Sequence, residues 1–477
     1  MRKKGMLSPF NTRRFRLAFA FALSFAYPVL AQTVVAINER ATEGYRLISR
    51  LNQNTTRLID RAGDTAHQWT SDYQVSTLVT LQKDGLLLRT CGMGNQAFKA
   101  GGGSGRVELL DWESNVVWSY ELSTDTEILH HDVKQMPNGN FLMLVWQKKS
   151  REEAVAAGVD PAQVGDSGIL FERVIEVRPD YPTGGEIVWE WNLIDHVIQD
   201  RFPDRPNYGE IAAHPELVNV HYTATDQNAD WFHANAVDYN PALDQILISV
   251  RNLSEIWIID HSTAPEEAAT HAGGVHGKGG DLLYRWGNPV VWSAGGDEQR
   301  TLGFQHNAHW IEAGLPGEGH ILVFVNEDPA NPTESRVVEI EPPLNADGGY
   351  DRPEGAPYGP AEPLWNYGAA IPGEFSSPFI SGMQRLANGN TMICSGVQAT
   401  VFEVTPEGEV LWRYVERAEG EPPNVWLFRA NFYAPDYSGL LGTPLYVEPV
   451  PEPDPDSAPE TAAKRRLSPA RPAASGR

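Results

Sequence analysis

The chain repeats one pattern of apolar and polar positions six times along its length. Each copy has a short apolar strand, a second strand that ends on Asp, Glu or Thr, a turn, and a third strand that closes on Trp, as in TVFEVTPEGEVLWRY at 400–414. The other copies lie at 56–69, 106–120, 173–191, 255–260 with 280–287, and 336–343 with 361–368. A further apolar strand precedes each copy, at 44–49, 83–90, 137–146, 243–250, 319–325 and 387–396. Asn-Gly or Asp-Gly turns often introduce these strands, and they favour tight hairpins because they supply positive φ angles. The pattern therefore predicts four-stranded units.

Four short strands cannot bury both of their faces alone, and radial stacking of such units is the usual solution. The sequence therefore predicts an all-β fold, a closed six-bladed β-propeller of four-stranded blades. The Trp that closes each copy is expected to pack between blades, because a large aromatic at one repeat position is typical of core. These residues are Trp69, Trp118, Trp189, Trp286, Trp365 and Trp412. Their irregular spacing predicts loops inserted in the middle units, where propellers often carry function.

The two ends of the chain differ from the repeats. Residues 1–31 combine a basic start, an apolar run and small residues near Ala31, which is typical of a secretory signal peptide. We therefore expect a periplasmic or secreted protein without a lasting membrane anchor. The propeller is expected at 32–447, followed by a disordered tail at 448–477 that is rich in Pro, Ala and charge.

The net charge limits the possible binding partners, and the two cysteines indicate whether a disulfide is expected. A formal net charge of −24 disfavours nucleic acid as a partner, and it leaves the oligomeric state open. Cys91 and Cys394 fall in the second and sixth units, which the first unit separates in the ring. Because a disulfide needs Cα atoms within about 7 Å, we expect two buried thiols.

Histidines gather at one position of the repeat. The motifs HHD at 130–132, DWFHAN at 230–235 and QHNAH at 305–309 each precede the first predicted strand of a unit. In a propeller such segments are expected to converge at one mouth of the central channel. The candidate catalytic residues are His131, His233 and His306, and the candidate substrate-binding residues are Asn235, Arg251, Asn252, Gln305, His309 and Thr400.

Several chemistries are open to such a cluster. Imidazoles and a guanidinium suit an anionic group such as sulfate or phosphate. Alternatively, the imidazoles satisfy backbone groups or hold water. Metal binding is less favoured because HExxH spacing is absent, and no metal ligand is assigned. Two weaker features are the loop HAGGVHGKGG at 271–280 and Arg429, which either reaches the mouth or clamps the ring closure.

The quoted motifs, together with GGDLLYRWGNP and SGMQRLANGNTMICSG, resemble the aryl-sulfate sulfotransferase family over residues 40 to 440. This resemblance implies a six-bladed propeller that transfers a sulfuryl group between phenols through a sulfated histidine, without a nucleotide donor or other cofactor. Its partners would be small aryl sulfates and phenols. His233 and His306 match the family's histidines that hold the sulfate oxygens. Where the family carries its nucleophilic histidine this chain has Thr400, and where relatives carry an Arg it reads NEDPANP at 326–332.

Three functions therefore compete. The first is an exported arylsulfotransferase-like enzyme in which His131 replaces the nucleophile or shuttles protons and Arg251 balances charge. The second is a non-catalytic propeller that binds a small anion or a protein partner. A quinone-dependent dehydrogenase is the third, and it would also require a calcium site and often vicinal cysteines, which the sequence does not offer.

Overall fold

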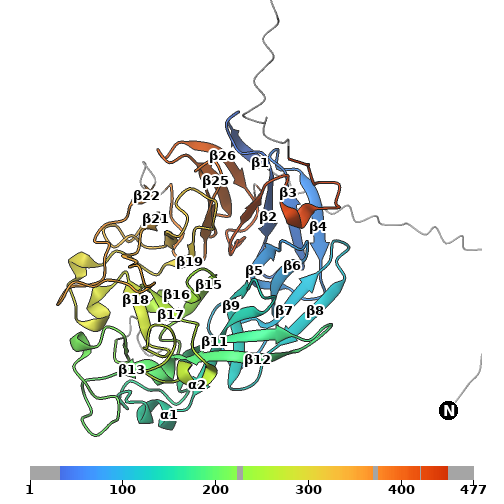
Figure 1. Ribbon diagram of the computed structural model, residues 1–477. Helices are drawn as coiled ribbons and strands as arrows, with labels where there is room; N and C mark the ends of the chain where they lie inside the picture. The colour runs from blue at the N-terminus through green and yellow to red at the C-terminus, as the bar shows by residue number, and fades with distance from the viewer. Residues whose placement is uncertain (1–32, 223–228, 369–373, 419, 450–477) are drawn as a thin grey trace, which may run out of the picture.

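Six four-stranded antiparallel sheets follow one another around a central axis (Figure 1). The computed structural model describes residues 33–222, 229–368, 374–418 and 420–449. The predicted all-β fold, a six-bladed β-propeller, is confirmed. Contacts between the first strands of neighbouring blades place these strands innermost.

The strands of the first three blades are given from the axis outward. Blade 1 contains β27 (Asn431–Tyr433), β2 (Tyr45–Ser49), β3 (Thr55–Ile59) and β4 (Thr65–Thr70). Blade 2 contains β5 (Val75–Leu81), β6 (Leu87–Gly92), β7 (Gly105–Leu110) and β8 (Val116–Glu121). Blade 3 contains β9 (Glu127–Gln135), β10 (Phe141–Lys149), β11 (Ile169–Pro179) and β12 (Gly185–Asn192).

The other three blades follow the same order. Blade 4 contains β15 (Ala234–Asn240), β16 (Gln245–Val250), β17 (Glu255–Asp260) and β18 (Leu282–Trp286). Blade 5 contains β19 (His306–Trp310), β20 (Ile321–Val325), β21 (Arg336–Ile340) and β22 (Trp365–Gly368). Blade 6 contains β23 (Gly382–Arg385), β24 (Thr391–Ser395), β25 (Thr400–Val404) and β26 (Val410–Val415), and β1 (Thr33–Ile37) pairs with β26 as a fifth strand.

Both ends of the described chain help to close the ring. The C-terminal strand β27 is the innermost strand of blade 1, where Asn431 pairs with Leu47 of β2. The N-terminal strand β1 lies on the outer edge of blade 6, where Ile37 pairs with Trp412 of β26. Blades 1 and 6 are neighbours, so each of them contains a strand from the opposite end of the chain.

The repeated Trp residues join every blade to the next one, as predicted. In each case the indole N–H on the outer strand donates to the turn before the outer strand of the following blade. The pairs are Trp69 with the carbonyl of Asp111 (3.1 Å), Trp118 with Gly184 (2.9 Å), Trp189 with the hydroxyl of Thr263 (3.1 Å), Trp286 with the carbonyl of Pro360 (2.8 Å), Trp365 with Pro406 (2.7 Å) and Trp412 with Arg61 (2.8 Å). Five of these side chains are buried, and Trp365 is half-buried.

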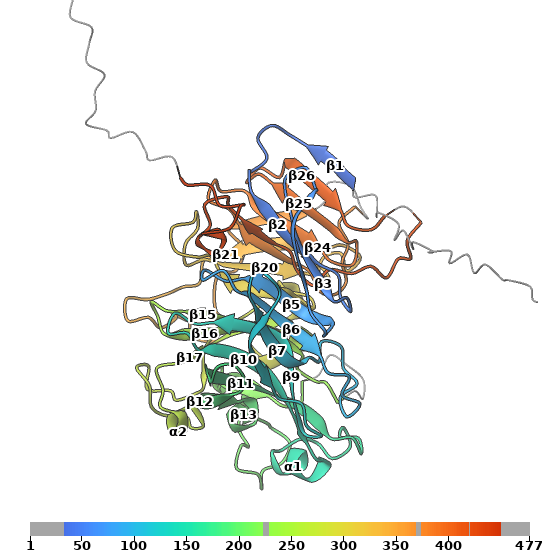
Figure 2. The same ribbon diagram turned by 90° about the vertical axis from the view of Figure 1, so that its right-hand side faces the viewer.

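The insertions predicted in the middle units gather at one side of the ring. Figures 1 and 2 both place α1 (Arg151–Ala156), α2 (Pro265–Ala268) and β13 (Val197–Ile198) beside blades 3 and 4, and β13 pairs in parallel with β14 (Val218–Asn219). Short 3₁₀ helices complete the fold: η1 (Leu193–His196), η2 (Ile211–Ala213), η3 (Arg251–Leu253), η4 (Pro289–Trp292), η5 (Asp297–Gln299) and η6 (Ser438–Leu440).

One assignment of the sequence analysis is wrong. The segments predicted as the first strands of their units, at 137–146, 243–250 and 319–325, form the second strands β10, β16 and β20. The histidine motifs at 130–132, 234–235 and 306–309 lie within the innermost strands β9, β15 and β19. The pattern missed these strands because polar residues interrupt their apolar alternation.

The expectations for the cysteines, the two chain ends and a membrane anchor have the following outcomes. Cys91 and Cys394 are buried free thiols, as predicted. The signal peptide lies outside the described residues, and so does the predicted tail beyond Pro449. Among the described residues, no helix has the length and apolarity that a membrane crossing requires.

We expect Trp118→Phe to lower the urea midpoint of unfolding. The side chain is fully buried, donates to the Gly184 carbonyl and stacks on Phe141 with ring centroids 4.8 Å apart. The substitution removes this hydrogen bond, worth about 0.5–1.5 kcal/mol net, and part of the buried ring that fills the space between the blades. Trp112→Phe is the matched control, because Trp112 is half-buried outside the repeat positions and stacks on His67. Equal midpoints for the two variants would contradict a role for the repeat hydrogen bond.

Candidate active site

The innermost strands of blades 3, 4 and 5 each carry a β-bulge. The register against the second strand shifts at residues 130–132 in β9, at Asn235 in β15, and at residues 307–308 in β19. The left-handed φ angles of His131 (50°) and His233 (56°) are uncommon for residues other than glycine. Bulges redirect side chains, and such backbone strain persists only where the surrounding structure fixes it. The backbone thus turns the polar motifs toward one another.

Two of the three candidate histidines lie beside one aromatic ring from the C-terminal segment, and the third contacts one of them. The ring of Phe428 lies 6.1 Å from that of His131 and 6.5 Å from that of His306, measured between centroids. His131 and His233 are closer to each other, at 4.6 Å. Blades 3, 4 and 5 and the segment before β27 therefore contribute to a single cluster, which we call the histidine cluster.

His233 is held by a carboxylate. Its Nδ1 lies 2.5 Å from Oδ2 of Asp230, three residues earlier. Because the carboxylate accepts the Nδ1 proton, the lone pair of the neutral ring stays on Nε2, and this atom has no hydrogen-bond partner among the described residues. The His233 side chain is 14% exposed, whereas His131 and His306 are buried. His233 is thus the most accessible of the three imidazoles.

His131 lies at the end of a buried chain of titratable groups. Its Nδ1 is 2.9 Å from Nδ1 of His130, so the two rings share one proton. Nε2 of His130 lies 3.0 Å from Oε2 of Glu172, although neither atom has an aligned hydrogen bond within the described part of the chain. Trp146 stacks on His130 with centroids 4.1 Å apart and donates to Oε1 of Glu172 at 3.3 Å.

Burial keeps this chain neutral. It raises the pKa of Glu172 to about 8, and the hydrogen bond from the N–H of Ala234 only partly offsets this effect. Burial also holds the pKa of His130 and that of His131 well below their usual range. Glu172 and His130 therefore face each other as a carboxylic acid and a neutral imidazole, despite a separation typical of an ion pair.

Both ring nitrogens of His306 are already engaged. Asn326 donates its amide to the carbonyls of Ser377 (2.6 Å) and Ile380 (2.8 Å), so its Oδ1 accepts from Nδ1 of His306 at 2.7 Å. Nε2 of His306 then accepts from the backbone N–H of Ile380 at 3.2 Å. Burial, followed by the charge of Arg251, holds the pKa of His306 well below its usual range. His306 is consequently a neutral, fixed imidazole.

Arg429 does reach the centre of the ring. It donates through Nη1 and Nη2 to the two carboxylate oxygens of Asp132, at 3.0 and 2.9 Å, and also to the carbonyl of Asn235 at 3.1 Å. Asp132 accepts in addition from the backbone N–H of Val237 at 3.0 Å. This bidentate ion pair and the bond to Asn235 join the C-terminal segment to blades 3 and 4.

Arg251 lies on the same side of blade 4 as His233. The backbone N–H of Arg251 donates to the carbonyl of His233 at 3.1 Å, and the Asn252 amide donates to the carbonyl of Asp230 at 2.8 Å. Nη1 of Arg251 donates to Oδ1 of Asn252 at 2.8 Å, and its guanidinium lies 4.7 Å from the centroid of Phe304. Its other N–H groups have no partner among the described residues and are free to meet an anion.

The remaining predicted site residues lie partly behind the histidine cluster and partly away from it. Asn235 donates to the carbonyl of Gln305 at 2.7 Å, and Gln305 donates to that of Glu255 at 2.8 Å, so both amides fix the backbone behind the cluster. His309 lies further along β19, where its Nδ1 bonds to the carbonyl of Asn307. Burial lowers the pKa of His309.

Thr400 lines a different cavity. It begins β25 and borders a hollow of about 900 Å³ together with Trp365 and Tyr367 of β22 and Arg413 of β26. Its hydroxyl donates to the carbonyl of Gln398 at 3.0 Å. The structure thus brings the histidines, Arg251, Asn252, Asn235 and Gln305 together, and places Thr400 between blades 5 and 6.

Sequence reasoning missed the groups behind the histidines. His130 was only part of a motif. Trp146 comes from the second strand of blade 3 and Glu172 from the third. Asp230 offered a signal, because it stands three residues before His233 in the same motif. Glu172, in the apolar run ILFERVIEV, was the other detectable anomaly, since carboxylates are seldom fully buried unless paired.

Fold and site together define a six-bladed propeller with a histidine-lined centre. The family model described as arylsulfotransferase (ASST) matches residues 32–422, so the chain belongs to this family. Membership indicates a sulfotransferase-type enzyme, with aryl sulfates and phenols as its substrate class. No curated protein matches the chain.

Solved structures resemble the chain only distantly. A Bacteroides caccae protein of unknown function is 11% identical, with 82% of this chain and 98% of that chain covered and a TM-score of 0.43. The Cps50 (Swd1) β-propeller domain of Myceliophteria thermophila is 10% identical, with 81% and 90% covered and a TM-score of 0.41. A streptogramin B lyase is 11% identical, with 81% and 88% covered and a TM-score of 0.36.

The raised pKa of Glu172 predicts a specific pH dependence of stability. An unfolded Glu titrates near 4.5, so between about pH 4.5 and about pH 8 the folded chain keeps a proton that the unfolded chain releases. The stability that this group contributes is complete below about pH 4.5 and is lost as pH rises to about 8. Glu172→Gln mimics the protonated acid and removes this loss.

Relative to the parent, Glu172→Gln should therefore gain stability as pH rises through this window, by up to about 1.4 kcal/mol per pH unit. Urea unfolding of both proteins from about pH 5 to about pH 8 measures the difference. A difference that does not change with pH would show that Glu172 titrates normally.

Proposed function

We propose that this protein transfers a sulfuryl group from an aryl sulfate to a phenolic acceptor through a covalent enzyme intermediate. The observation that carries the proposal is the accessible His233, whose Nδ1 is fixed by Asp230 and whose Nε2 is free beside His131 and Arg251. Membership of the arylsulfotransferase family supports the reaction class.

His233 is the best-placed nucleophile. A nucleophile of this kind needs a free lone pair and a neighbouring group that orients it, and Asp230 provides the orientation. In the first step Nε2 attacks sulfur, the bond from sulfur to the aryl oxygen breaks, and the phenol oxygen takes the electron pair. The resulting N-sulfuryl imidazolium keeps its Nδ1 proton beside Asp230, whose negative charge stabilises it. An acceptor phenol then reverses these steps on the same sulfur.

His131 is placed to supply and recover the phenol proton. Its Nε2 has no partner among the described residues, and its Nδ1 shares a proton with His130. When the Glu172 acid donates to Nε2 of His130, His130 donates from Nδ1 to His131, and Nε2 of His131 carries a proton. As this proton passes to the departing phenolate, the protons of His130 and Glu172 each move one position along the chain, which leaves Glu172 as a carboxylate. A proton from the acceptor phenol later returns by the same route and restores the acid. The gap between His130 and Glu172 needs only a small realignment, as catalytic hydrogen bonds often do before substrate binds.

Two further groups shape the anion site. Arg251 offers free N–H groups to the sulfuryl oxygens, and its fixed positive charge offsets the charge that develops on them. His306 is neutral and hydrogen-bonded through both nitrogens, so it forms a rigid wall of the site. This assignment moves the nucleophile from His131, the first candidate from the sequence, to His233.

The test is intact-protein mass after the full exported chain is mixed with para-nitrophenyl sulfate, first alone and then with a phenol. We expect a gain of one sulfuryl group that the phenol removes, and no gain in His233→Asn. Asp230→Asn should slow nitrophenol release by at least about 100-fold, the lower range for a lost acid–base partner. Thr400→Val is the matched control and should react like the parent, because Thr400 lines a separate cavity.

The proton-shuttle role of His131 has its own signature. In His131→Asn the rate should fall further for phenyl sulfate, whose phenolate needs protonation, than for para-nitrophenyl sulfate, whose leaving group is more stable. Equal losses with both donors would assign His131 a positioning role. An adduct that persists in His233→Asn and disappears in His131→Asn or Thr400→Val would move the nucleophile to that residue.

A non-catalytic anion-binding propeller is the second candidate function. Two observations favour it. Both ring nitrogens of His306 already have hydrogen-bond partners, and Thr400 lies outside the histidine cluster, so neither residue is free to act as the family's donor or nucleophile here. In that case the parent forms no adduct and releases no nitrophenol, yet calorimetry detects binding of the aryl sulfate, and Arg251→Gln weakens this binding.

A further inference from the structure

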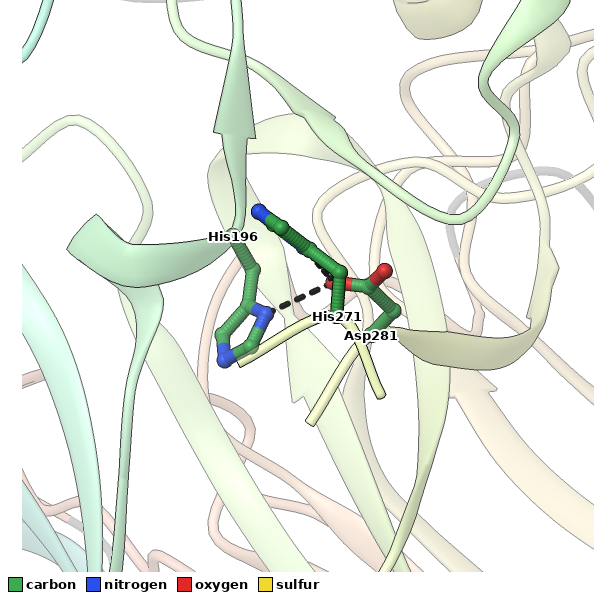
Figure 3. A group of neighbouring side chains, drawn as sticks. All are labelled: His196, His271 and Asp281. Carbon is green, nitrogen blue, oxygen red and sulfur yellow. Dashed lines mark hydrogen bonds and ion pairs between the residues drawn. The ribbon is translucent and has the colours of Figure 1, made fainter. Parts of the chain in front are cut away.

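Two histidines and a carboxylate meet at the outer edge of blades 3 and 4, outside the histidine cluster (Figure 3). His196 ends η1, directly after the outer strand of blade 3. His271 and Asp281 come from the insertion between β17 and β18 of blade 4. Their ligand atoms lie within 4.8 Å of one another, and this is the one such group of three among the described residues. We call it the peripheral triad.

The triad converges on one oxygen. Oδ1 of Asp281 lies 2.8 Å from Nδ1 of His196 and 2.8 Å from Nδ1 of His271 (Figure 3). The two imidazole rings are nearly perpendicular, at 88°, with centroids 5.9 Å apart. Both Nδ1 atoms therefore point to the same small volume beside the carboxylate.

The surroundings fix which nitrogen of His196 is available. Nε2 lies 2.9 Å from the carbonyl of Ala268, which only accepts, so Nε2 carries a proton and donates it. In a neutral ring Nδ1 then presents its lone pair to an oxygen lone pair of Asp281. Two lone pairs face each other stably only when a proton or a metal ion lies between them. A metal-bound histidine commonly donates its other N–H to a carbonyl, which fixes its tautomer in this way.

The position of His196 is rigid. The ring is fully buried and lies parallel to Trp191, with 3° between the planes and 5.5 Å between centroids. The indole N–H of Trp191 donates to the carbonyl of Gly280 at 2.7 Å. A Cβ at Gly280 would stand 2.6 Å from Nε2 of His196, so glycine lets the insertion pack directly on the ring. The position of His196, one of the three candidate ligands, is thus fixed by the fold without a bound ion.

We propose that the peripheral triad binds one divalent transition-metal ion of the zinc type, through Nδ1 of His196, Nδ1 of His271 and Oδ1 of Asp281. Imidazole and carboxylate ligands suit zinc, and three protein ligands leave a fourth tetrahedral position for water. His271 is 61% exposed, so this position faces solvent. Tetrahedral zinc with ligand bonds of about 2.0–2.1 Å holds its ligands about 3.3 Å apart. Both 2.8 Å separations from Oδ1 of Asp281 would therefore widen by about 0.5 Å, through small movements of Asp281 and of the exposed His271 against the fixed His196.

The ion joins elements that the repeat does not join. It links η1 of blade 3 to the insertion of blade 4, beside the repeat hydrogen bond from Trp189 to Thr263. Zinc bound in this way replaces the proton that otherwise lies between His196 and Asp281, so binding releases protons and stabilises the insertion. This site is separate from the sulfuryl-transfer proposal, and its test does not use enzyme activity.

The experiment is calorimetric titration of zinc chloride into the metal-stripped, tag-free full chain. We expect one ion per chain in the parent. His271→Ala and Asp281→Asn should each weaken binding by more than the roughly 10- to 100-fold loss typical of removing an outer-sphere partner. His276→Ala is the matched control, because His276 belongs to the same insertion and contacts Gln245 instead of the triad. Its affinity should equal that of the parent.

Two readouts keep the proposal testable if a variant is unstable. Cobalt(II) should give the intense visible absorption of a tetrahedral site in the parent and in His276→Ala, and lose it in His271→Ala. Zinc should raise the thermal midpoint of the same two proteins only. Binding that is equal in the parent and His271→Ala, or no binding in the parent, would overturn the proposal and identify the triad as a protonated His–Asp–His hydrogen-bond cluster.

Discussion

The ring depends on one hydrogen bond repeated around the axis, from the indole on the outer strand of a blade to a turn of the following blade. This bond needs a large apolar ring that fills the space between two sheets and a donor at its edge, and Trp alone supplies both. The sixth bond, from Trp412 to the carbonyl of Arg61, joins the last blade to the first. A buried ion pair also joins neighbouring blades, between Arg385 of blade 6 and Glu339 of blade 5. A linear chain thus becomes a closed ring in which each blade completes its neighbour.

Closure also builds the active site. The strand β27 must lie innermost in blade 1, so the residues just before it, Phe428 and Arg429, enter the centre. There Arg429 neutralises Asp132, and Phe428 contacts both His131 and His306. The remaining cation, Arg251, faces neutral imidazoles whose pKa values are lowered by burial and by positive neighbours. In the proposed reaction an anionic substrate meets the guanidinium of Arg251 beside neutral imidazoles, while the Asp230 carboxylate is engaged by Nδ1 of His233. This arrangement suits a sulfuryl group without protonation of His131 or His306.

The insertions at the periphery are stabilised by other contacts than those that hold the repeated blades together. Insertions in blades 3 and 4 leave the repeat, and they need their own contacts because no neighbouring blade covers them. Trp191, outside the repeat positions, supports His196, and the glycine at position 280 lets the blade 4 insertion reach it. The peripheral triad therefore occupies the place where a structural link between the two insertions is most useful, at a distance from the sulfuryl-transfer chemistry.

The sequence by itself determined the number of blades, the packing role of the six repeat Trp residues and the identity of His131, His233 and His306 as one group. These features depend on periodic apolar positions and on local turns, which act over a few residues and can be read from the chain. The innermost strands were missed because a polar channel removes their apolar alternation. Only the tertiary structure decided the partners of each histidine: Asp230 for His233, the His130 and Glu172 chain for His131, and Asn326 for His306. Hydrogen-bond partners and burial bring together residues that are distant in sequence. The roles that we propose for the three histidines, as nucleophile, proton carrier and fixed neighbour, therefore follow from what the fold places beside each of them.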